Sequence, residues 1–204
     1  MTKFEFISRF KNDLPGASAH EAFAPYRKHF ENKTNVTRKP AAVAIHFYVH
    51  LGNWYFIIIE RSSYDGKHSA QMAFPGGKPE TNDPHLEFTA RRESEEEIGI
   101  PTIQGELISE LSLVWIPVSS FEVTPFVILH DERPTIQLNE REVANCFEVH
   151  LDELLDDSSV SKTTIQVNKE VQLEDIPCFL LNGKIVWGAT ALILAELKTL
   201  LKND

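Results

Sequence analysis

The sequence predicts a mixed α/β fold, and three observations predict it. Two strand-like segments lie close together in the first third of the chain, a helix bounded by proline and glycine lies in the middle, and a hairpin followed by a helix lies near the end. The chain has 204 residues, of which 42% are hydrophobic, so it can bury one ample core. Nothing in it suggests two complete domains.

The expected strands are segments rich in β-branched and aromatic residues. The first two are 41–49 and 54–60, and Leu51-Gly52-Asn53 joins them. A second group follows the central helix, and its best candidates are 107–115, 121–129 and 143–149. Strands before and after an inserted helix are typical of a mixed α/β fold.

Turn residues place the elements near the end of the chain. Asn182-Gly183 lies between the apolar segments 179–181 and 184–187, and this dipeptide is the strongest short hairpin signal in a sequence. The segment 189–201 that follows is expected to be a helix. Two further helices are expected near the N-terminus, at 4–10 and 19–30.

The central helix has start and stop residues. Asp83 is expected to be its N-cap and Pro84 its first residue. Gly99 supplies a left-handed C-cap, and Pro101 prevents continuation. One stripe of this helix begins apolar and ends acidic, and its members are Leu86, Ala90, Glu93 and Glu97, with Thr89 and Glu96 beside them. A stripe that continues from core into carboxylates favours a functional site over an ordinary solvated face.

The residues around this stripe are suited to a cation. Phe74-Pro75-Gly76-Gly77 ends a short apolar strand before the helix, and two glycines let the backbone approach a ligand closely. Glu93, Glu96 and Glu97 stand on the helix behind the Arg91-Arg92 pair. Carboxylates fixed beside an exposed backbone carbonyl are what Mg²⁺ or Mn²⁺ needs when a phosphate chain must also be held.

The compound pattern resembles the Nudix box, which is a glycine followed by spaced acidic positions, Arg-Glu, two residues, Glu-Glu, one residue, glycine and an aliphatic residue. In this chain the positions are Gly77, Asp83, Arg92-Glu93, Glu96-Glu97, Gly99 and Ile100. The match departs in three ways. Asp83 replaces a glutamate, eight residues rather than seven separate it from Arg92, and Ser94 replaces an apolar residue. A box that is one residue longer and has an aspartate at this position is expected of the coenzyme A diphosphatase branch, so this part of the chain resembles that branch of the family.

An upstream segment resembles the second motif of the same branch. Residues 59–77 follow the branch's Arg-Ser, Arg and Gly-Gln-Val-x-Phe-Pro-Gly-Gly pattern in the same register. Two positions depart from it. Gly66, next to Lys67, stands where the branch has a basic residue, and Ala70 stands where it has a glycine. Glycine cannot replace the fork of an arginine as a phosphate partner, so these two positions bear directly on the coenzyme A assignment.

Together the similar segments cover roughly residues 38–200. The resemblance divides the chain into an N-terminal helical extension, 1–37, and a Nudix hydrolase domain, 38–204. It implies a Nudix-type α/β/α sandwich with a mixed β-sheet. The segment 156–176 matches nothing in the family.

The resemblance also implies roles for individual residues. The ligands of Mg²⁺ or Mn²⁺ would be Glu93, Glu96, Glu97 and, through its carbonyl, Gly76. Arg92 would hold a glutamate in position through its planar guanidinium group. The base would be Glu93 or, alternatively, Glu142 in the loop before a late strand, since members of the family differ in this. Glu140 and Glu142 are both also explicable as solvated acids of that loop, and this interpretation suits Glu140 better.

The charge of the chain limits its partners. A net charge of −10 argues against nucleic acid and against an anionic membrane surface as general partners. A phosphate substrate then requires local positive charge from the cation and from nearby bases. The candidates are Arg61, Lys67, His68 and Lys78, each of which is also explicable as an ordinary surface charge.

The remaining composition is that expected of a soluble cytoplasmic enzyme. Charged residues interrupt the only apolar stretch near the N-terminus, so we expect no signal peptide and no membrane span. Cys146 and Cys178 are expected to be buried thiols of a reducing compartment. His46 and His50 are expected to be structural, because a zinc site would need a third ligand that the sequence does not place. No nucleophile motif appears.

The expected function is divalent-metal-dependent hydrolysis of a small nucleoside diphosphate derivative. The resemblance implies coenzyme A or acyl-coenzyme A as substrate, with 3′,5′-ADP and phosphopantetheine as products. Alternatives within the family are ADP-ribose, dinucleotides and nucleoside triphosphates. A third hypothesis is a catalytically silent nucleotide-binding domain, which would predict a broken box, whereas its charged positions are intact. Homodimers are common in this family, so a homodimer is one possible assembly.

Overall fold

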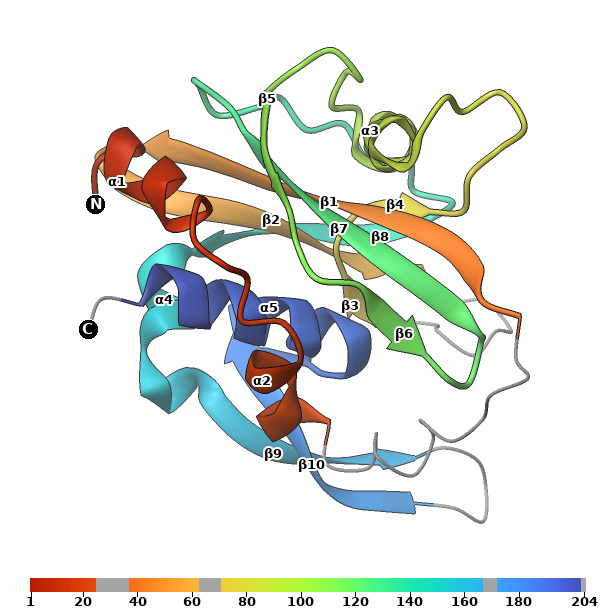
Figure 1. The fold of residues 1–204 in the computed structure, drawn as a ribbon, viewed down its shortest axis with the longest axis vertical. Coiled ribbons are helices and arrows are strands. Elements are labelled where there is room, and N and C mark those ends of the chain that lie inside the picture. Colours follow the sequence, from red (N-terminus) through yellow and green to blue (C-terminus); the bar gives the residue numbers. More distant parts are fainter. Residues whose placement is uncertain (25–36, 63–70, 167–171, 203–204) are drawn as a thin grey trace.

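A mixed β-sheet with helices on both faces forms the body of the protein (Figure 1). The computed structural model describes residues 1–24, 37–62, 71–166 and 172–202. Within these residues, eight strands make the main sheet, with β1 at its centre. Strand β1 pairs in parallel with β7 and antiparallel with β2, so the sheet is mixed. Helix α3 covers one face and α5 the other, which confirms the expected α/β/α sandwich.

The elements follow one another in this order along the chain. The main sheet contains β1 (Lys39–His50), β2 (Asn53–Arg61), β3 (Met72–Ala73), β4 (Gly76–Gly77), β5 (Glu106–Glu110), β6 (Val114–Ile116), β7 (Phe121–Leu129) and β8 (Val143–His150). A smaller antiparallel sheet contains β9 (Val160–Gln166), β10 (Gln172–Leu181) and β11 (Lys184–Val186). The helices are α1 (Lys3–Arg9), α2 (Ala17–His20), α3 (Leu86–Ile98), α4 (Leu151–Leu155) and α5 (Gly188–Leu201).

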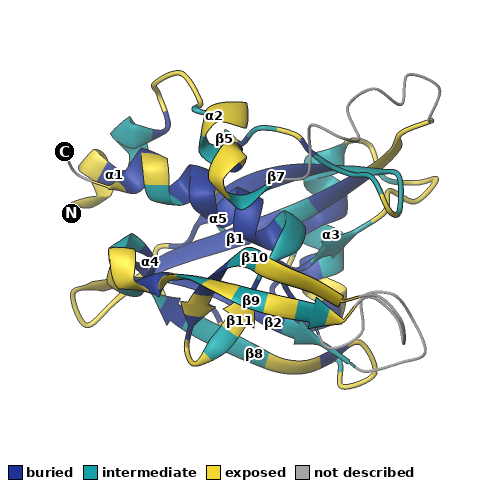
Figure 2. Ribbon diagram, turned by 90° about the horizontal axis from the view of Figure 1, so that it is seen from below, coloured by how far each residue is buried: buried dark blue, intermediate teal, exposed yellow. Residues whose placement is uncertain are grey.

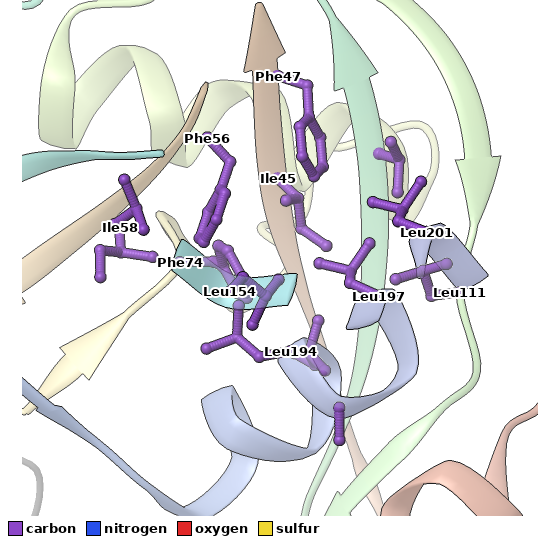
Figure 3. Packing of buried hydrophobic residues seen from close by; sticks show 14 of the residues in the cluster. Ile45, Phe47, Phe56, Ile58, Phe74, Leu111, Leu154, Leu194, Leu197 and Leu201 are labelled. Atoms are coloured by element: carbon purple, nitrogen blue, oxygen red, sulfur yellow. The ribbon is translucent and has the colours of Figure 1, made fainter. Parts of the chain in front are cut away.

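Helix α5 lies between the main sheet and the smaller sheet. It is buried along most of its length, whereas β9 and β10 carry exposed segments (Figure 2). Leu194 and Leu197 pack against a sheet face that includes Ile45 and Phe47 of β1 (Figure 3). Full burial of such a side chain contributes about 1.5–3 kcal/mol relative to exposure. This core holds β1 from one side and leaves the opposite face of the strand to α3.

Helix α1 belongs to the same core. Phe6 is fully buried, and its ring stacks on Trp54 with the centroids 4.2 Å apart. A capping box between Thr2 and Glu5 starts the helix, and Trp54 Nε1 donates to the carbonyl of Met1 at 2.8 Å. The N-terminal segment therefore packs onto the main sheet. Its division from the rest of the chain as a separate extension stays a prediction.

Most predicted elements are confirmed. The predicted strand 121–129 is β7, and the predicted strands 41–49, 54–60 and 143–149 lie within β1, β2 and β8. The predicted C-terminal helix is α5. The hairpin is present as well, because Leu181 pairs with Lys184. Its turn residues Asn182 and Gly183 have φ angles of 48° and 69°, as a type I′ turn requires.

The predicted start of the central helix was wrong. Helix α3 begins at Leu86, and its N-cap is His85, whose Nδ1 accepts from the amide of Phe88 at 3.1 Å. Asp83 does not cap the helix because Arg92 and Thr89 occupy its carboxylate. The predicted C-cap is confirmed, since Gly99 has a φ of 74°.

Two further predictions were wrong in part. The strand expected at 107–115 is broken into β5 and β6, because the amide and hydroxyl of Ser112 turn to the buried carboxylate of Glu196. The helix expected at 19–30 is short in its described part, where α2 passes into a 3₁₀ turn at Glu21–Phe23. Pro25 follows Ala24, and a proline disfavours the helical conformation of the residue before it. Residues 25–30 lie outside the described residues.

Candidate active site

Two glycines bring strand β4 against both β1 and α3. Gly76 pairs with Val43 and Gly77 with Ala42 of β1. A Cβ atom on Gly76 would lie 2.2 Å from the carbonyl oxygen of Ala42, and one on Gly77 would lie 2.5 Å from the carboxyl carbon of Glu93. No other residue type fits at 76, and a side chain at 77 would displace the carboxylate of Glu93. The sequence Gly-Gly therefore lets the helix carboxylate lie directly on the backbone.

Glu97 is the most deeply buried carboxylate of the predicted site. Its side chain is 0% exposed. The amide of Gly76 donates to Oε2 at 2.9 Å, and Arg61 Nη1 donates to Oε1 at 3.0 Å. Burial raises the pKa of Glu97 to about 7, although these two donors oppose the rise and the charges of Glu93 and Glu142 add to it. The two donors therefore offset only part of the cost of burying the Glu97 charge.

Arg92 lies at the centre of the other carboxylates. Its guanidinium group donates to Asp83 Oδ1 at 3.1 Å, to Glu93 Oε1 at 2.9 Å and to Glu96 Oε2 at 2.9 Å. It also donates to the carbonyl of Lys78 at 3.1 Å, which ties the helix to the segment after β4. The hydrogen bonds from Arg92 lower the pKa of Asp83 to about 2. A planar fork is needed for this arrangement, because a lysine ammonium could not bridge all of these groups.

Glu93 and Glu96 differ in exposure. The side chain of Glu93 is 17% exposed, and that of Glu96 is 51% exposed. Burial raises the pKa of Glu93, while Arg92 opposes the rise. Glu93 thus faces the protein beside Gly77, whereas Glu96 lies at the solvent edge of the cluster.

Glu142 reaches the site from a loop that runs along the end of α3. In this loop, Gln137 donates to the carbonyl of Ile98 at 2.9 Å and Asn139 to that of Glu97 at 3.0 Å. The charge of Glu142 contributes to the raised pKa of both Glu93 and Glu97, after burial as the main cause. The structure therefore brings Glu142 within electrostatic reach of the helix carboxylates.

The predicted substrate-binding bases are placed differently. Arg61 contacts Glu97 and thus belongs to the acidic cluster itself. Lys78 is exposed, and its Nζ lies 5.3 Å from the ring centre of Phe121. Lys67 and His68 lie outside the described residues, and so do the two departing positions Gly66 and Ala70.

The cluster can supply oxygen ligands to a cation. Among the residues that the structure describes, no three carboxylate, imidazole or thiol groups already converge as a ready cation cage. Guanidinium groups hold the carboxylates instead, since Arg92 binds Glu93 and Glu96 while Arg61 binds Glu97. Carboxylates on one helix, two of them with raised pKa values, fit the hard oxygen ligands that a divalent cation prefers.

A second polar cluster lies beneath α3, and the sequence did not predict it. His46 Nε2 is 2.9 Å from Ser94 Oγ, and His46 Nδ1 is 2.8 Å from His130 Nε2. Burial lowers the pKa of both histidines, that of His130 to about 4. The structural role expected for His46 fits this position. The one sequence signal was Ser94, which stands where the box has an apolar residue.

The fold and the acidic helix define a class of enzyme, the hydrolases that act on phosphoric anhydride bonds and generally use divalent cations. A family model described as NUDIX domain matches residues 37–167. The chain therefore belongs to the Nudix hydrolase family.

Two bacterial relatives are similar in sequence to nearly the whole chain. A protein of Yersinia enterocolitica serotype O:8 / biotype 1B, named as a Nudix hydrolase, NudL, is 32% identical over 202 residues, which are 96% of this chain and 91% of that protein. The NudL protein of Yersinia pestis strain Pestoides F is 32% identical over 197 residues, which are 95% of this chain and 92% of that protein.

Solved structures support the fold. A MutT/nudix family protein from Enterococcus faecalis aligns with a TM-score of 0.52 and 12% identity, over 96% of this chain and 73% of that one. A MutT protein from Methanosarcina mazei Go1 aligns with a TM-score of 0.51 and 16% identity, over 81% of this chain and 96% of that one. In the described part of the chain, no helix is both long and apolar enough to span a membrane.

Proposed function

We propose that this Nudix hydrolase cleaves the diphosphate of coenzyme A or acyl-coenzyme A, giving 3′,5′-ADP and phosphopantetheine or its acyl form. The observation that carries the branch is Asp83 with its one-residue expansion before Arg92. The shorter carboxylate still reaches Arg92 at 3.1 Å, and its side chain is 2% exposed. The altered spacing therefore preserves the link between the first acidic position and the arginine.

The proposed cofactor is Mg²⁺ or Mn²⁺. The proposed ligands are the carboxylates of Glu93, Glu96 and Glu97 and the carbonyl of Gly76. When bound, such a cation neutralises charge on the phosphates and lowers the pKa of a bound water. The close contact of Gly77 with the Glu93 carboxylate supports the proposal, because any larger residue would fill the space that this carboxylate uses.

Residues of the chain would position the base and accept the proton of the attacking water. Arg92 donates to Glu93 Oε1, so it fixes the orientation of that carboxylate and the proton would be taken up at Oε2. In the cation-free protein, burial raises the pKa of Glu93 while Arg92 opposes the rise. Glu142 remains the alternative base, because its charge acts on the same carboxylates.

Arg61, Lys67 and Lys78 are proposed to hold the phosphates of the substrate. Arg61 offsets the charge of Glu97 at the site, which reduces the repulsion that a phosphate would meet. Lys78 directly follows Gly77 and is exposed beside it. Lys67 lies outside the described residues, so its part in the proposal rests on the sequence motif.

A substrate panel tests the proposal. The purified protein would be assayed with Mg²⁺ and then Mn²⁺ against coenzyme A, acetyl-coenzyme A, ADP-ribose, NADH and a nucleoside triphosphate, with the products separated by chromatography. Release of 3′,5′-ADP from coenzyme A, lost in Glu97→Gln, is the expected result. Turnover of another diphosphate alone would contradict the coenzyme A assignment and retain the hydrolase. Absence of metal-dependent turnover would favour the silent binding domain.

A double substitution separates the coenzyme A hypothesis from its rivals within the family. Gly66→Arg with Ala70→Gly restores both positions at which the chain departs from the branch motif. We expect kcat/KM for coenzyme A to rise while that for ADP-ribose stays unchanged. An equal change for both substrates would count against a coenzyme A role for this segment.

The compartment and the assembly are also proposals. Cys146 and Cys178 are free thiols, which is consistent with the reducing cytoplasm. A homodimer rests on family resemblance alone. Sedimentation of the purified protein would measure it.

A further inference from the structure

Three buried polar side chains join helix α3 to the sheet. Ser94 is 0% exposed, His46 1% and His130 3%. His46 stands on β1 at the centre of the sheet, and His130 directly follows β7, the parallel neighbour of β1. The amide of His130 donates to the carbonyl of Phe47 at 2.8 Å, so the backbone fixes its position on the sheet.

The hydrogen bonds of this cluster have a direction. Ser94 Oγ donates to the carbonyl of Ala90 at 2.8 Å, so it accepts from His46 Nε2 at 2.9 Å. A neutral imidazole with its proton on Nε2 accepts at Nδ1, and His130 Nε2 is therefore the donor at 2.8 Å. The chain of donors runs from His130 through His46 and Ser94 to the backbone of α3.

The opposite direction is less favourable. If Ser94 donated to His46, the proton of His130 would lie on Nδ1. That atom is buried and has no hydrogen-bond partner among the described residues. A bare acceptor there costs less than a bare N–H donor, because an orphaned buried N–H group is among the rarest features of folded proteins.

The backbone around His130 is shaped to enclose the ring. Gly105 has a φ of +83°, and a Cβ atom on it would lie 2.9 Å from His130 Cε1. Arg91 of α3 holds this loop by donating to the carbonyls of Thr102, Gln104 and Gly105 at 3.3, 2.9 and 3.2 Å. Helix α3 thus also holds the loop that lies against the ring of His130.

The series of hydrogen bonds from His130 to Ser94 ends one helical turn before Glu97. Ser94 and Glu97 are three residues apart and share the buried face of α3. Strand β1 carries His46, and through Val43 it also pairs with Gly76, whose amide donates to Glu97 at 2.9 Å. Strand β1 therefore contacts the last turns of α3 in two ways. His46 binds Ser94 of the helix, and Gly76, which pairs with β1, binds the carboxylate of Glu97.

We propose that Ser94, His46 and His130 are positioning residues that set the height and rotation of α3, and thereby the placement of Glu93 and Glu97 for a divalent cation. The proposal rests on the proposed function, because it takes these carboxylates as cation ligands. It explains why a polar residue replaces the apolar residue of the box. An apolar side chain at 94 would leave the N–H of His46 buried without an acceptor.

Imidazole nitrogen NMR tests the direction of the chain. In protein labelled with ¹⁵N, both His46 and His130 are expected in the neutral form with the proton on Nε2. Their signals would be assigned by their loss in His46→Gln and His130→Gln. A proton on Nδ1 of His46 would overturn the proposed direction. This measurement needs neither a cation nor a substrate.

Mn²⁺ binding tests the positioning role. Ser94→Ala is expected to weaken Mn²⁺ binding about tenfold, the lower end of the loss that follows when a group that orients metal ligands is removed. Ser94→Thr retains the hydroxyl and is expected to recover most of this loss. The matched control is Ser159→Ala, which removes a buried hydroxyl that donates to the carbonyls of Leu154 and Asp156, away from α3. Its Mn²⁺ affinity is expected to equal that of the wild type.

The outcomes are distinguishable. All proteins would be compared below their thermal transitions, so that loss of fold is excluded by circular dichroism. Wild-type affinity in Ser94→Ala, or an equal loss in Ser159→Ala, would overturn the positioning role. A wild-type protein that binds no Mn²⁺ would instead contradict the proposed function, and the NMR result would still decide the hydrogen-bond chain.

Discussion

Helix α3 has two polar sides, and they are built in opposite ways. Beneath it, Ser94, His46 and His130 are neutral and joined donor to acceptor. At its edge, the carboxylates of Asp83, Glu93, Glu96 and Glu97 face the two guanidinium groups of Arg61 and Arg92. Neutral bonds hold the helix in place, while the other side retains an excess of negative charge. That excess of negative charge is what a divalent cation would neutralise.

The pKa values express the same contrast. Burial raises the pKa of Glu97 to about 7, so part of its charge is uncompensated in the protein alone. Burial lowers the pKa of His130 to about 4, so the histidine side stays neutral near pH 7. One side of the helix is therefore sensitive to cations and the other is sensitive to acid.

Removal of the Glu97 charge is expected to have the largest effect. Glu97→Gln should lower kcat/KM for the hydrolysed diphosphate about 1,000-fold, which corresponds to about 4 kcal/mol of transition-state stabilisation. The control is Glu95→Gln, the same change at an exposed position of α3 that binds the amide of Thr102. Steady-state kinetics with saturating Mg²⁺ would measure both. Equal losses in the two variants would mean that charge, and not position, matters.

The stability of the cation-free protein should depend on Glu97. Because folding raises this pKa, the native state binds the proton more tightly, and stability falls as pH rises from about 4.5 to about 7. The loss relative to Glu97→Gln is expected to reach about 3 kcal/mol, at about 1.4 kcal/mol per unit of pKa. Urea unfolding at several pH values in the presence of a chelator measures it. A constant difference between the two proteins would contradict the burial argument.

Arg92 should act through its shape as well as its charge. Arg92→Lys keeps the charge but cannot bridge Asp83, Glu93 and Glu96, and we expect a loss of about 100-fold in kcat. The comparison variant is Arg133→Lys, which alters a two-bonded pair with Glu148 outside the cluster. A wild-type rate in Arg92→Lys would show that the positive charge alone is sufficient.

The histidine side should respond to acid. Folding lowers the pKa of His130, so stability is present above about pH 6.5 and is lost as pH falls toward about 4. Between pH 6.5 and 5 the loss is expected to be about 2 kcal/mol, at about 1.4 kcal/mol per unit of pKa. His130→Gln removes this titration, so the difference in unfolding free energy between the two proteins should shrink over that range. An unchanged difference would indicate that His130 is charged in the native state.

Local patterns predicted the parts of the fold that local chemistry decides. Gly99 ends α3 and Asn182-Gly183 makes a hairpin, because both depend on backbone angles that few residues adopt. The start of α3 failed because Asp83 has a distant partner, Arg92, that no capping rule includes. Where a side chain such as Asp83 has two suitable partners, the tertiary structure decides which of them it binds.

The candidate site shows the same limit. The acidic positions were evident from their spacing on one helix. The contacts of His46 with Ser94 and His130 were not, because these residues come from separate elements and meet only when β1 and β7 pair beneath α3. The part that Glu142 plays depends likewise on how its loop packs along the helix.

The acidic end of α3 is proposed to bind a divalent cation. Titration of the wild type and Glu97→Gln with Mn²⁺ at pH 8, followed by electron paramagnetic resonance of the free ion, measures this binding. We predict saturable binding by the wild type and at least a tenfold weaker constant for Glu97→Gln. Equal binding by both proteins would show that the Glu97 carboxylate is not a ligand of the cation.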